Sequence, residues 1–199
     1  MRKLYTIIFA LIALLSMTMS VQALESKEIV RQNGAYASAD WVETNDGVTT
    51  YTCLSVTETN DGTDIYVSMW TYDEVTGYSS DKYGYMFTED DVFSIDKKLN
   101  SASLSEVEIV VDEWYYNEMG EYTYETGTMT VGADWIGIGD TSRGSYKYVS
   151  KDGDYVFRST ENSLFREATV TGLIDGINLG SQSSASLVKF KTASMNMKK

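Results

Sequence analysis

The sequence predicts an all-β fold, an antiparallel two-sheet sandwich of about ten strands with one or two short helices, and a closed β-barrel is the alternative. Turn signals recur at short, regular intervals, and the segments between them are rich in Val, Ile, Thr, Tyr and Trp. Both features are typical of sandwiches and barrels. Asp-Gly pairs predict hairpin turns, because Gly tolerates the positive φ that these turns require. The pairs are Asp46-Gly47, Asp61-Gly62, Asp152-Gly153 and Asp175-Gly176.

A short direct repeat supports the division into strands. The segment Glu43 to Gly47 recurs as Glu58 to Gly62, fifteen residues later, which is the length of one strand plus one turn of a meander. The last predicted strand is expected to return to the sheet. The predicted strands are residues 35–43, 48–57, 63–72, 83–87, 104–113, 122–133, 145–150, 154–159, 168–174 and 187–197.

Two segments indicate which side of a strand is buried. From Glu106 to Asp112 the apolar residues Val107, Ile109 and Val111 alternate with acidic ones, so one face is expected to be buried and the other solvated. The segment from Ile65 to Trp70 carries large side chains on both faces, which favours a central strand.

Helix is expected in two places only. Glu25 to Gln32 could form two turns that end at Asn33-Gly34. Asp90 to Leu99 is preceded by a capping residue, Thr88, although Val92 to Ile95 fits a strand equally well.

Residues 1–23 have the three-part layout of a secretory signal peptide. Arg2 and Lys3 precede an apolar run from Ile7 to Leu15, and a polar stretch then ends at Ala23. We expect cleavage after Ala23, and retention as an N-terminal anchor is the alternative. Residues 24–199 then form a single β domain, secreted or associated with the cell envelope.

The predicted mature chain is strongly acidic. Residues 24–199 contain 14 basic and 29 acidic side chains, a net charge of minus 15. This charge repels nucleic acid and anionic membranes, so we expect no nucleic-acid partner and no membrane insertion after signal removal.

The charge is also unevenly distributed along the chain. Residues 24–142 carry a net charge of minus 19 and residues 143–199 a net charge of plus 4. We expect the C-terminal strands to pair with the acidic strands within one sheet. The alternative is self-association, in which a basic edge meets the acidic face of a second copy.

The chain contains no His and a single Cys, Cys53. A Ser or Cys nucleophile usually needs an imidazole base, and zinc or copper sites usually need His or several Cys. We therefore predict no catalytic residues and no resident cofactor, and we interpret Cys53 as a small, buried, apolar side chain.

The carboxylates permit two further hypotheses. A strand face with Glu106, Glu108 and Asp112 could present the carboxylate pair of an acidic carbohydrate-active hydrolase. Calcium is the one metal we retain as an option, since it takes carboxylate and carbonyl oxygens. Its candidate ligands are Glu89, Asp90 and Asp91, with Asp61 and Asp64 or Asp152 and Asp154 as further pairs.

The chain is rich in Tyr and Trp, with fifteen Tyr and four Trp, and this abundance is the strongest indication of a binding surface. Exposed Tyr and Trp supply rigid contact surface to a protein or glycan partner, although aromatic residues are also ordinary in half-buried strands. The segments expected to carry such a row are residues 78–87 and 114–124, and the ligand-binding candidates within them are Tyr83, Tyr85, Trp114, Tyr115 and Tyr116.

These observations predict a non-catalytic β domain that binds a protein or glycan, or serves a structural role. The alternatives are the carboxylate hydrolase and a barrel that carries a small apolar ligand. The direction of the aromatic side chains distinguishes them: outward in a row for a binding domain, around an acidic cleft for an enzyme, and inward around a cavity for a carrier.

Overall fold

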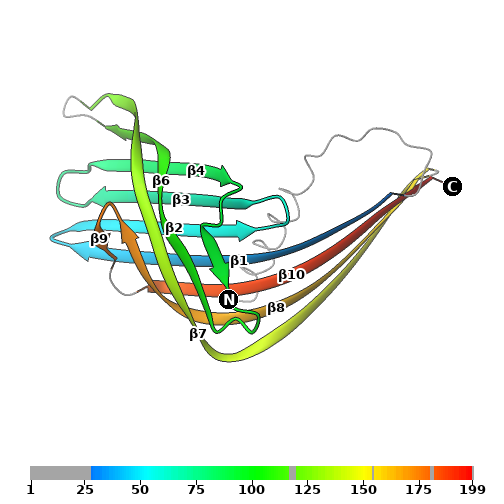
Figure 1. Ribbon diagram of the computed structural model, residues 1–199. Coiled ribbons are helices and arrows are strands. Elements are labelled where there is room, and N and C mark those ends of the chain that lie inside the picture. The colour runs from blue at the N-terminus through cyan, green and yellow to red at the C-terminus, as the bar shows by residue number, and fades with distance from the viewer. Residues whose placement is uncertain (1–27, 117–119, 154, 180–181, 199) are drawn as a thin grey trace.

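The computed structural model describes residues 28–116, 120–153, 155–179 and 182–198. These residues form ten antiparallel β-strands (Figure 1). The strands are β1 (Glu28–Asn45), β2 (Val48–Glu58), β3 (Thr63–Asp73), β4 (Ser79–Thr88), β5 (Phe93–Ile95), β6 (Ser101–Tyr116), β7 (Tyr122–Asp152), β8 (Tyr155–Ile174), β9 (Ile177–Asn178) and β10 (Gln182–Lys198).

All ten strands belong to one antiparallel sheet that folds over on itself. The hydrogen-bonded order is β10, β1, β2, β3, β4, β6, β7, β8 and β9, with β5 on β6. β10 also pairs with β8, so the strand pairing returns to its starting point. In Figure 1, β6 and β7 cross in front of the layer formed by β1 to β4. The predicted all-β, antiparallel, sandwich-like fold is therefore confirmed, with both layers belonging to one continuous sheet.

The core lies between these layers and contains side chains from both. Alternation sets the buried face of each strand: Ala35, Ala37, Ala39 and Trp41 of β1 are buried, and the residues between them are not. The predicted alternation of β6 is confirmed in the same way. The largest fully buried side chains are Trp41, Trp135, Phe93, Leu54, Ile65, Leu99, Ile109, Met129 and Leu187.

Both predicted helices are wrong, because the described residues contain no helix. Residues 25–27 of the first lie outside the described part of the chain. Residues 28–32 belong to β1 and pair with residues 192–196 of β10. Partners so distant in sequence are invisible to a local pattern, and the ladder they form overrides a weak helical preference. Within the described residues, no helix has the length and apolar character needed to cross a membrane.

The second predicted helix is replaced by turns around β5. The backbone N–H of Asp90 donates to Thr88 Oγ1 at 3.0 Å, so the predicted capping residue does organise a turn. Phe93 then enters the core at 2% exposure, and β5 pairs with β6. The alternative strand within Val92 to Ile95 is thus confirmed. Leu99, at the end of the segment, has φ of 59° and is fully buried.

Each Asp-Gly pair lies at a turn between consecutive strands. At the β1–β2 turn Asp46 and Gly47 have φ of 50° and 84°, and at the β8–β9 turn Asp175 and Gly176 have φ of 50° and 76°. Two consecutive residues with positive φ define the type I′ turn, whose twist matches the flanking strands.

Four strands continue beyond the core and form what we call the arm (Figure 1). The remaining described residues form the body. The arm contradicts the predicted strand boundaries, since β7 and β8 each join two segments that we expected to be separate. The pairing of β7 with β8 shifts register between Ile138 and Ser142 and then continues, so β7 remains one strand through this segment. The arm consists of residues 29–34, 143–152, 155–164 and 189–197, paired in the order β1, β10, β8, β7.

Candidate functional site

A row of five cross-strand partners, four of them aromatic, crosses the outward face of the body. Trp70 of β3 pairs in register with Tyr51 of β2 and with Asp81 of β4. Asp81 pairs in turn with Trp114 of β6, and Trp114 with Tyr124 of β7. Directly opposite residues of antiparallel strands project from the same face. Because neighbouring strands lie about 4.8 Å apart, the backbones of Trp70 and Trp114 are about 10 Å apart with Asp81 between them.

The rings in and beside this row form two clusters, which we call together the aromatic face. In the first, Trp70 lies 5.1 Å from Tyr51 and 6.0 Å from Tyr72, centroid to centroid, and the planes of Trp70 and Tyr72 differ by 7°. In the second, Trp114 lies 5.3 Å from Tyr122 and 4.6 Å from Tyr124. Tyr116 completes the second cluster at 5.4 Å from Tyr122.

These rings are open to solvent although they pack on one another. Trp70 is 39% exposed, Tyr51 44% and Tyr122 61%. Neighbouring rings hold each other in place, so little rotamer entropy remains to be lost when a ligand binds. The aromatic face is therefore a preformed apolar surface at the outside of the sheet.

Carboxylates lie beside the rings. Asp112 Oδ1 accepts a hydrogen bond from the Tyr124 hydroxyl at 2.6 Å and one from the Thr126 hydroxyl at 3.3 Å. Asp81 is exposed between Trp70 and Trp114. The aromatic face can thus offer ring faces together with acceptors for hydroxyl or amino groups of a ligand.

The structure brings four of the five predicted ligand-binding residues to this outward side. Trp114 and Tyr116 belong to the aromatic face. Tyr83 pairs in register with Asp112, and Tyr85 with Tyr66, so both extend the same surface along β4. The hydroxyl of Tyr85 donates to Asp64, and this bond raises the pKa of Tyr85 to about 12.

Tyr115 does not join the aromatic face. It alternates with Trp114 and Tyr116 along β6 and therefore projects from the opposite side of the strand. Its hydroxyl donates to Glu125 Oε1 at 2.6 Å, which raises the pKa of Tyr115.

Five members of the aromatic face were not predicted individually, although Tyr122 and Tyr124 lie within the expected segment 114–124. Trp70 and Tyr72 are two residues apart and project from the same side of β3, and Tyr122 and Tyr124 do the same on β7. Tyr51 joins them only as the cross-strand partner of Trp70. That signal was present in the sequence, but only the strand register shows which segments lie side by side. The unpredicted members are Tyr51, Trp70, Tyr72, Tyr122 and Tyr124.

The acidic residues of the hydrolase hypothesis lie on the outward face of β6. Glu106 and Glu108 are exposed, and Asp112 is half-buried beside Tyr124. These three residues line neither of two hollows that the described residues form, of about 310 and 650 Å³.

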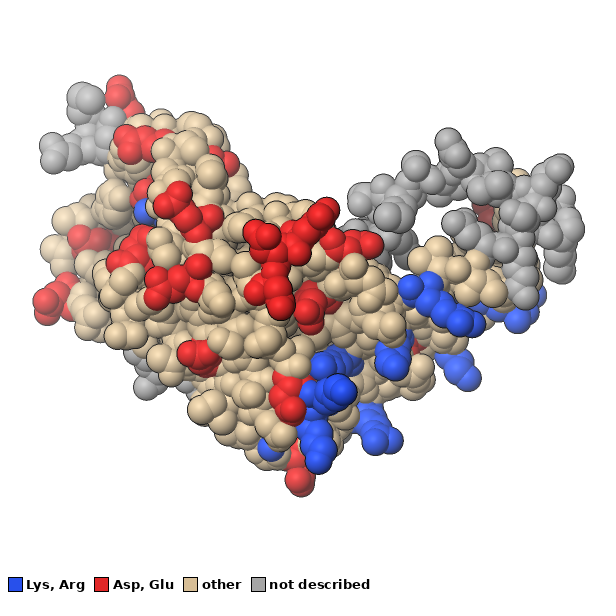
Figure 2. Space-filling model, viewed as in Figure 1, with Lys and Arg blue, Asp and Glu red and all other residues tan. Residues whose placement is uncertain are grey.

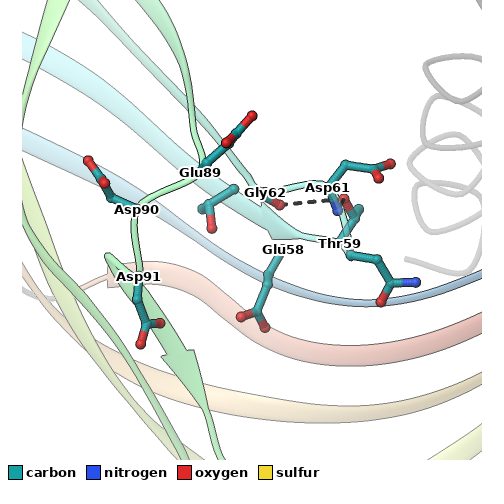
Figure 3. A pocket seen from close by; sticks show the side chains of 9 residues that line it. Glu58, Thr59, Asp61, Gly62, Glu89, Asp90 and Asp91 are labelled. Atoms are coloured by element: carbon teal, nitrogen blue, oxygen red, sulfur yellow. Dashed lines mark hydrogen bonds between the residues drawn. The ribbon is translucent and has the colours of Figure 1, made fainter.

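Four of the calcium candidates line the smaller hollow next to the β2–β3 turn, and Asp64 and Asp152 do not (Figure 3). The four are Asp61, Glu89, Asp90 and Asp91. Glu89, Asp90 and Asp91 point in different directions there. The described residues contain no group of three or more His, Cys, Asp or Glu that could hold a metal ion. We therefore assign no metal to this hollow. Asp154, a member of one further candidate pair, lies outside the described residues.

Cys53 is half-buried on β2, opposite Asp40 of β1. Burial, followed by the charge of Asp40, raises the pKa of the Cys53 thiol from about 9 to about 12. The thiol is therefore neutral at ordinary pH, in line with its interpretation as a small apolar side chain rather than a reactive group.

We expect Cys53 to resist alkylation in the folded protein. A pKa of about 12 makes the thiolate fraction at pH 8 on the order of 1000-fold smaller than for a thiol with a pKa of about 9. The rate of iodoacetamide labelling, followed by mass, should be far lower in buffer than in urea. Equal rates would contradict this assignment. Since the folded pKa is the higher one, the associated stability should be present below about pH 9 and be lost as the pH rises towards 12.

The aromatic side chains that point inward belong to a filled interior. Trp41 and Trp135 are each 1% exposed, and Phe93 meets Trp135 edge to face at 6.3 Å. Among the described residues, most of the other Tyr and Trp side chains are exposed.

Comparison with protein-family models, with curated proteins and with solved structures finds no match for this chain.

Proposed function

We propose that the protein is an exported, non-catalytic β domain that binds a neutral glycan along the aromatic face. The single observation on which this proposal rests is the row of cross-strand partners in which Asp81 lies between Trp70 and Trp114. Rows of exposed aromatic residues directed outward are the arrangement expected of a binding domain.

Sugar rings match the chemistry of this surface. The C–H side of a pyranose packs on the face of an indole or phenol ring, because that face is electron-rich and apolar. The hydroxyls at the rim of the sugar then reach the carboxylates of Asp81 and Asp112, which accept strong, charge-assisted hydrogen bonds. The separation of about 10 Å between Trp70 and Trp114 resembles the repeat of two sugar units in an extended β-linked chain.

The charge of the body favours a neutral glycan over an acidic one. Asp81, Asp112 and Asp64 all lie on or beside the aromatic face, and Lys82 on the neighbouring position of β4 is paired with Glu113 at 3.0 Å. A uronic acid or sulfated sugar would meet uncompensated carboxylates there.

Substitution of Trp70 or Trp114 by Ala is expected to weaken glycan binding. Truncating a central aromatic contact typically costs about 2 kcal/mol or more, which is about a 30-fold loss of affinity. Binding would be measured by calorimetry with β-1,4-linked hexaoses of glucose, xylose, mannose and N-acetylglucosamine. At least one hexaose should bind the native protein, and each variant should bind it at least tenfold more weakly.

Tyr146→Ala provides the matched control, because Tyr146 is a similarly exposed aromatic residue on the arm, at 61% exposure. Its affinity should equal that of the native protein. Native-like affinity of both Trp variants, or equal losses in all three variants, would refute the aromatic face as the binding surface.

A further inference from the structure

The basic side chains of the arm all lie on one face. The arm ranges contain seven basic residues, and the register places all seven on the side that is continuous with the core face of β1 and β8. The two acidic residues of the arm, Asp152 and Glu161, project from the opposite side. The basic residues are Arg31, Arg143, Lys147, Lys151, Arg158, Lys189 and Lys191.

These seven residues form a regular ladder, which we call the basic ladder. Successive rows on one face of a strand lie two residues, or about 7 Å, apart. Every row from the base of the arm to its tip contributes at least one cation. From base to tip the rows hold Lys189 with Arg143, then Lys191, then Arg31 with Lys147, then Arg158, then Lys151.

Within the described part of the chain none of the seven residues of the basic ladder forms an ion pair, and Lys189 alone lies close enough to Glu58 and Asp96 to interact with their charges. Six of the seven side chains are exposed, and Lys189 is half-buried. Figure 2 shows basic side chains gathered along the arm and acidic ones over the body. β10 pairs with β1 of the acidic part within the one sheet, as expected, and in the arm the basic segments of β7, β8 and β10 also pair with one another.

Between the cations the same face offers neutral hydrogen-bonding groups. The second row contains Asn33, Asn162 and Ser145 beside Lys191, and the third contains Thr160. At the base, the larger hollow of about 650 Å³ is lined by Arg143, Lys189, Lys191 and both of these Asn residues, with Glu58 as its acidic lining residue. The face is thus a cationic track about 27 Å long that ends in a hollow.

We propose that the basic ladder binds a linear polyanion, a polysaccharide with carboxylate or sulfate groups at regular intervals. Cations repeated at one spacing over five rows match a polymer that presents its charges at regular intervals. The acidic face of β6 in a second copy is a poorer match, because Val110 interrupts the series Glu106, Glu108 and Asp112. The acidic body does not prevent this binding, because at 0.1 M salt the repulsion between charges more than about 10 Å apart is largely screened. The cations of the arm therefore dominate the interaction with a polyanion that lies along them.

The test measures binding of the purified protein to polygalacturonate and to dextran sulfate, with neutral dextran as a control. These probes distinguish a carboxylate-bearing from a sulfate-bearing ligand. The protein should bind at least one polyanion and not dextran. Between about 0.05 and 0.3 M salt the affinity should fall at least tenfold, because bound cations release counterions.

The decisive variant combines Arg143→Glu with Lys191→Glu, and it should reduce polyanion affinity at least tenfold. Its control combines Lys97→Glu with Lys98→Glu, which changes the net charge equally in a turn of the body. The control should bind as the native protein does, and both variants should keep the native thermal transition.

Three outcomes would overturn the proposal. Equal losses in both variants would mean that only overall charge acts. Absence of binding to both polyanions at low salt would exclude the ligand class. Salt-sensitive oligomers in sedimentation without polyanion binding would assign the basic ladder to a second copy instead. None of these outcomes depends on the glycan proposal, because the two surfaces share no residue.

Discussion

Removal of residues 181–199 is expected to abolish cooperative unfolding. These residues contain β10, which pairs with β1 along one edge and with β8 along the other. Without β10 both neighbours would present unpaired edges, and Leu187, which is fully buried, would be missing from the core. Exposed edges of this length also promote aggregation. The loss should therefore exceed the roughly 5 to 15 kcal/mol that typically stabilises a domain.

Circular dichroism during heating would measure this effect. The truncated protein should show no sigmoidal transition. A chain that ends at Thr192 is the control, because it loses only the outer arm and keeps Leu187 and the base of β10. That control should unfold cooperatively. A normal transition in the shorter chain would show that β10 does not join β1 to β8.

Replacement of Trp135 by Ala is expected to be among the most destabilising single substitutions in this protein. Trp135 is 1% exposed, contacts Phe93 edge to face, and donates from Nε1 to the Ser38 carbonyl at 3.0 Å. Truncating a buried Trp typically costs about 3 to 5 kcal/mol, and the hydrogen bond from Trp135 Nε1 is lost with the side chain.

Urea denaturation would give this difference as a shift in midpoint. Tyr146→Ala is again the control, since an exposed side chain away from the core usually changes stability by about 0.5 kcal/mol or less. Trp135→Ala should lose several kcal/mol, or fail to fold, while the control remains native. A cost of less than about 1 kcal/mol would mean that Trp135 is not packed between the two layers.

The features predicted correctly from the sequence are those set by local chemistry. Asp-Gly pairs form turns because few other dipeptides adopt two consecutive positive φ values, as at Asp46 and Gly47. The alternation of Val107, Ile109 and Val111 with acidic residues placed one face of β6 in the core. Both signals operate within a few residues, so no knowledge of partners was needed.

The features that were missed depend on partners distant in sequence. Residues 28–32 form a strand because β10 supplies ladder partners that are 160 to 168 residues away in the sequence. The sequence predicts separate strands at residues 122–133 and 145–150, but pairing with β8 carries β7 through the register shift between Ile138 and Ser142. The arm was therefore not foreseen.

The candidate surfaces were predicted only in part for the same reason. The surplus of aromatic residues was evident, and Trp114 was correctly chosen, but its alignment with Trp70 through Asp81 requires the register of three strands. The charge difference between the two parts of the chain was also evident. That all seven basic residues share one face of the arm follows only from the pairing of β1, β10, β8 and β7.

The most direct test of the proposed function is the response of the four indole N–H signals in a nitrogen–proton correlation spectrum during titration with a hexaose. Trp70 and Trp114 are on the aromatic face, whereas Trp41 and Trp135 are in the core. Glycan binding predicts saturable shifts of the Trp70 and Trp114 signals while the Trp41 and Trp135 signals stay in place. Shifts confined to Trp41 and Trp135, or no shift of any indole signal with any of the four hexaoses, would contradict it.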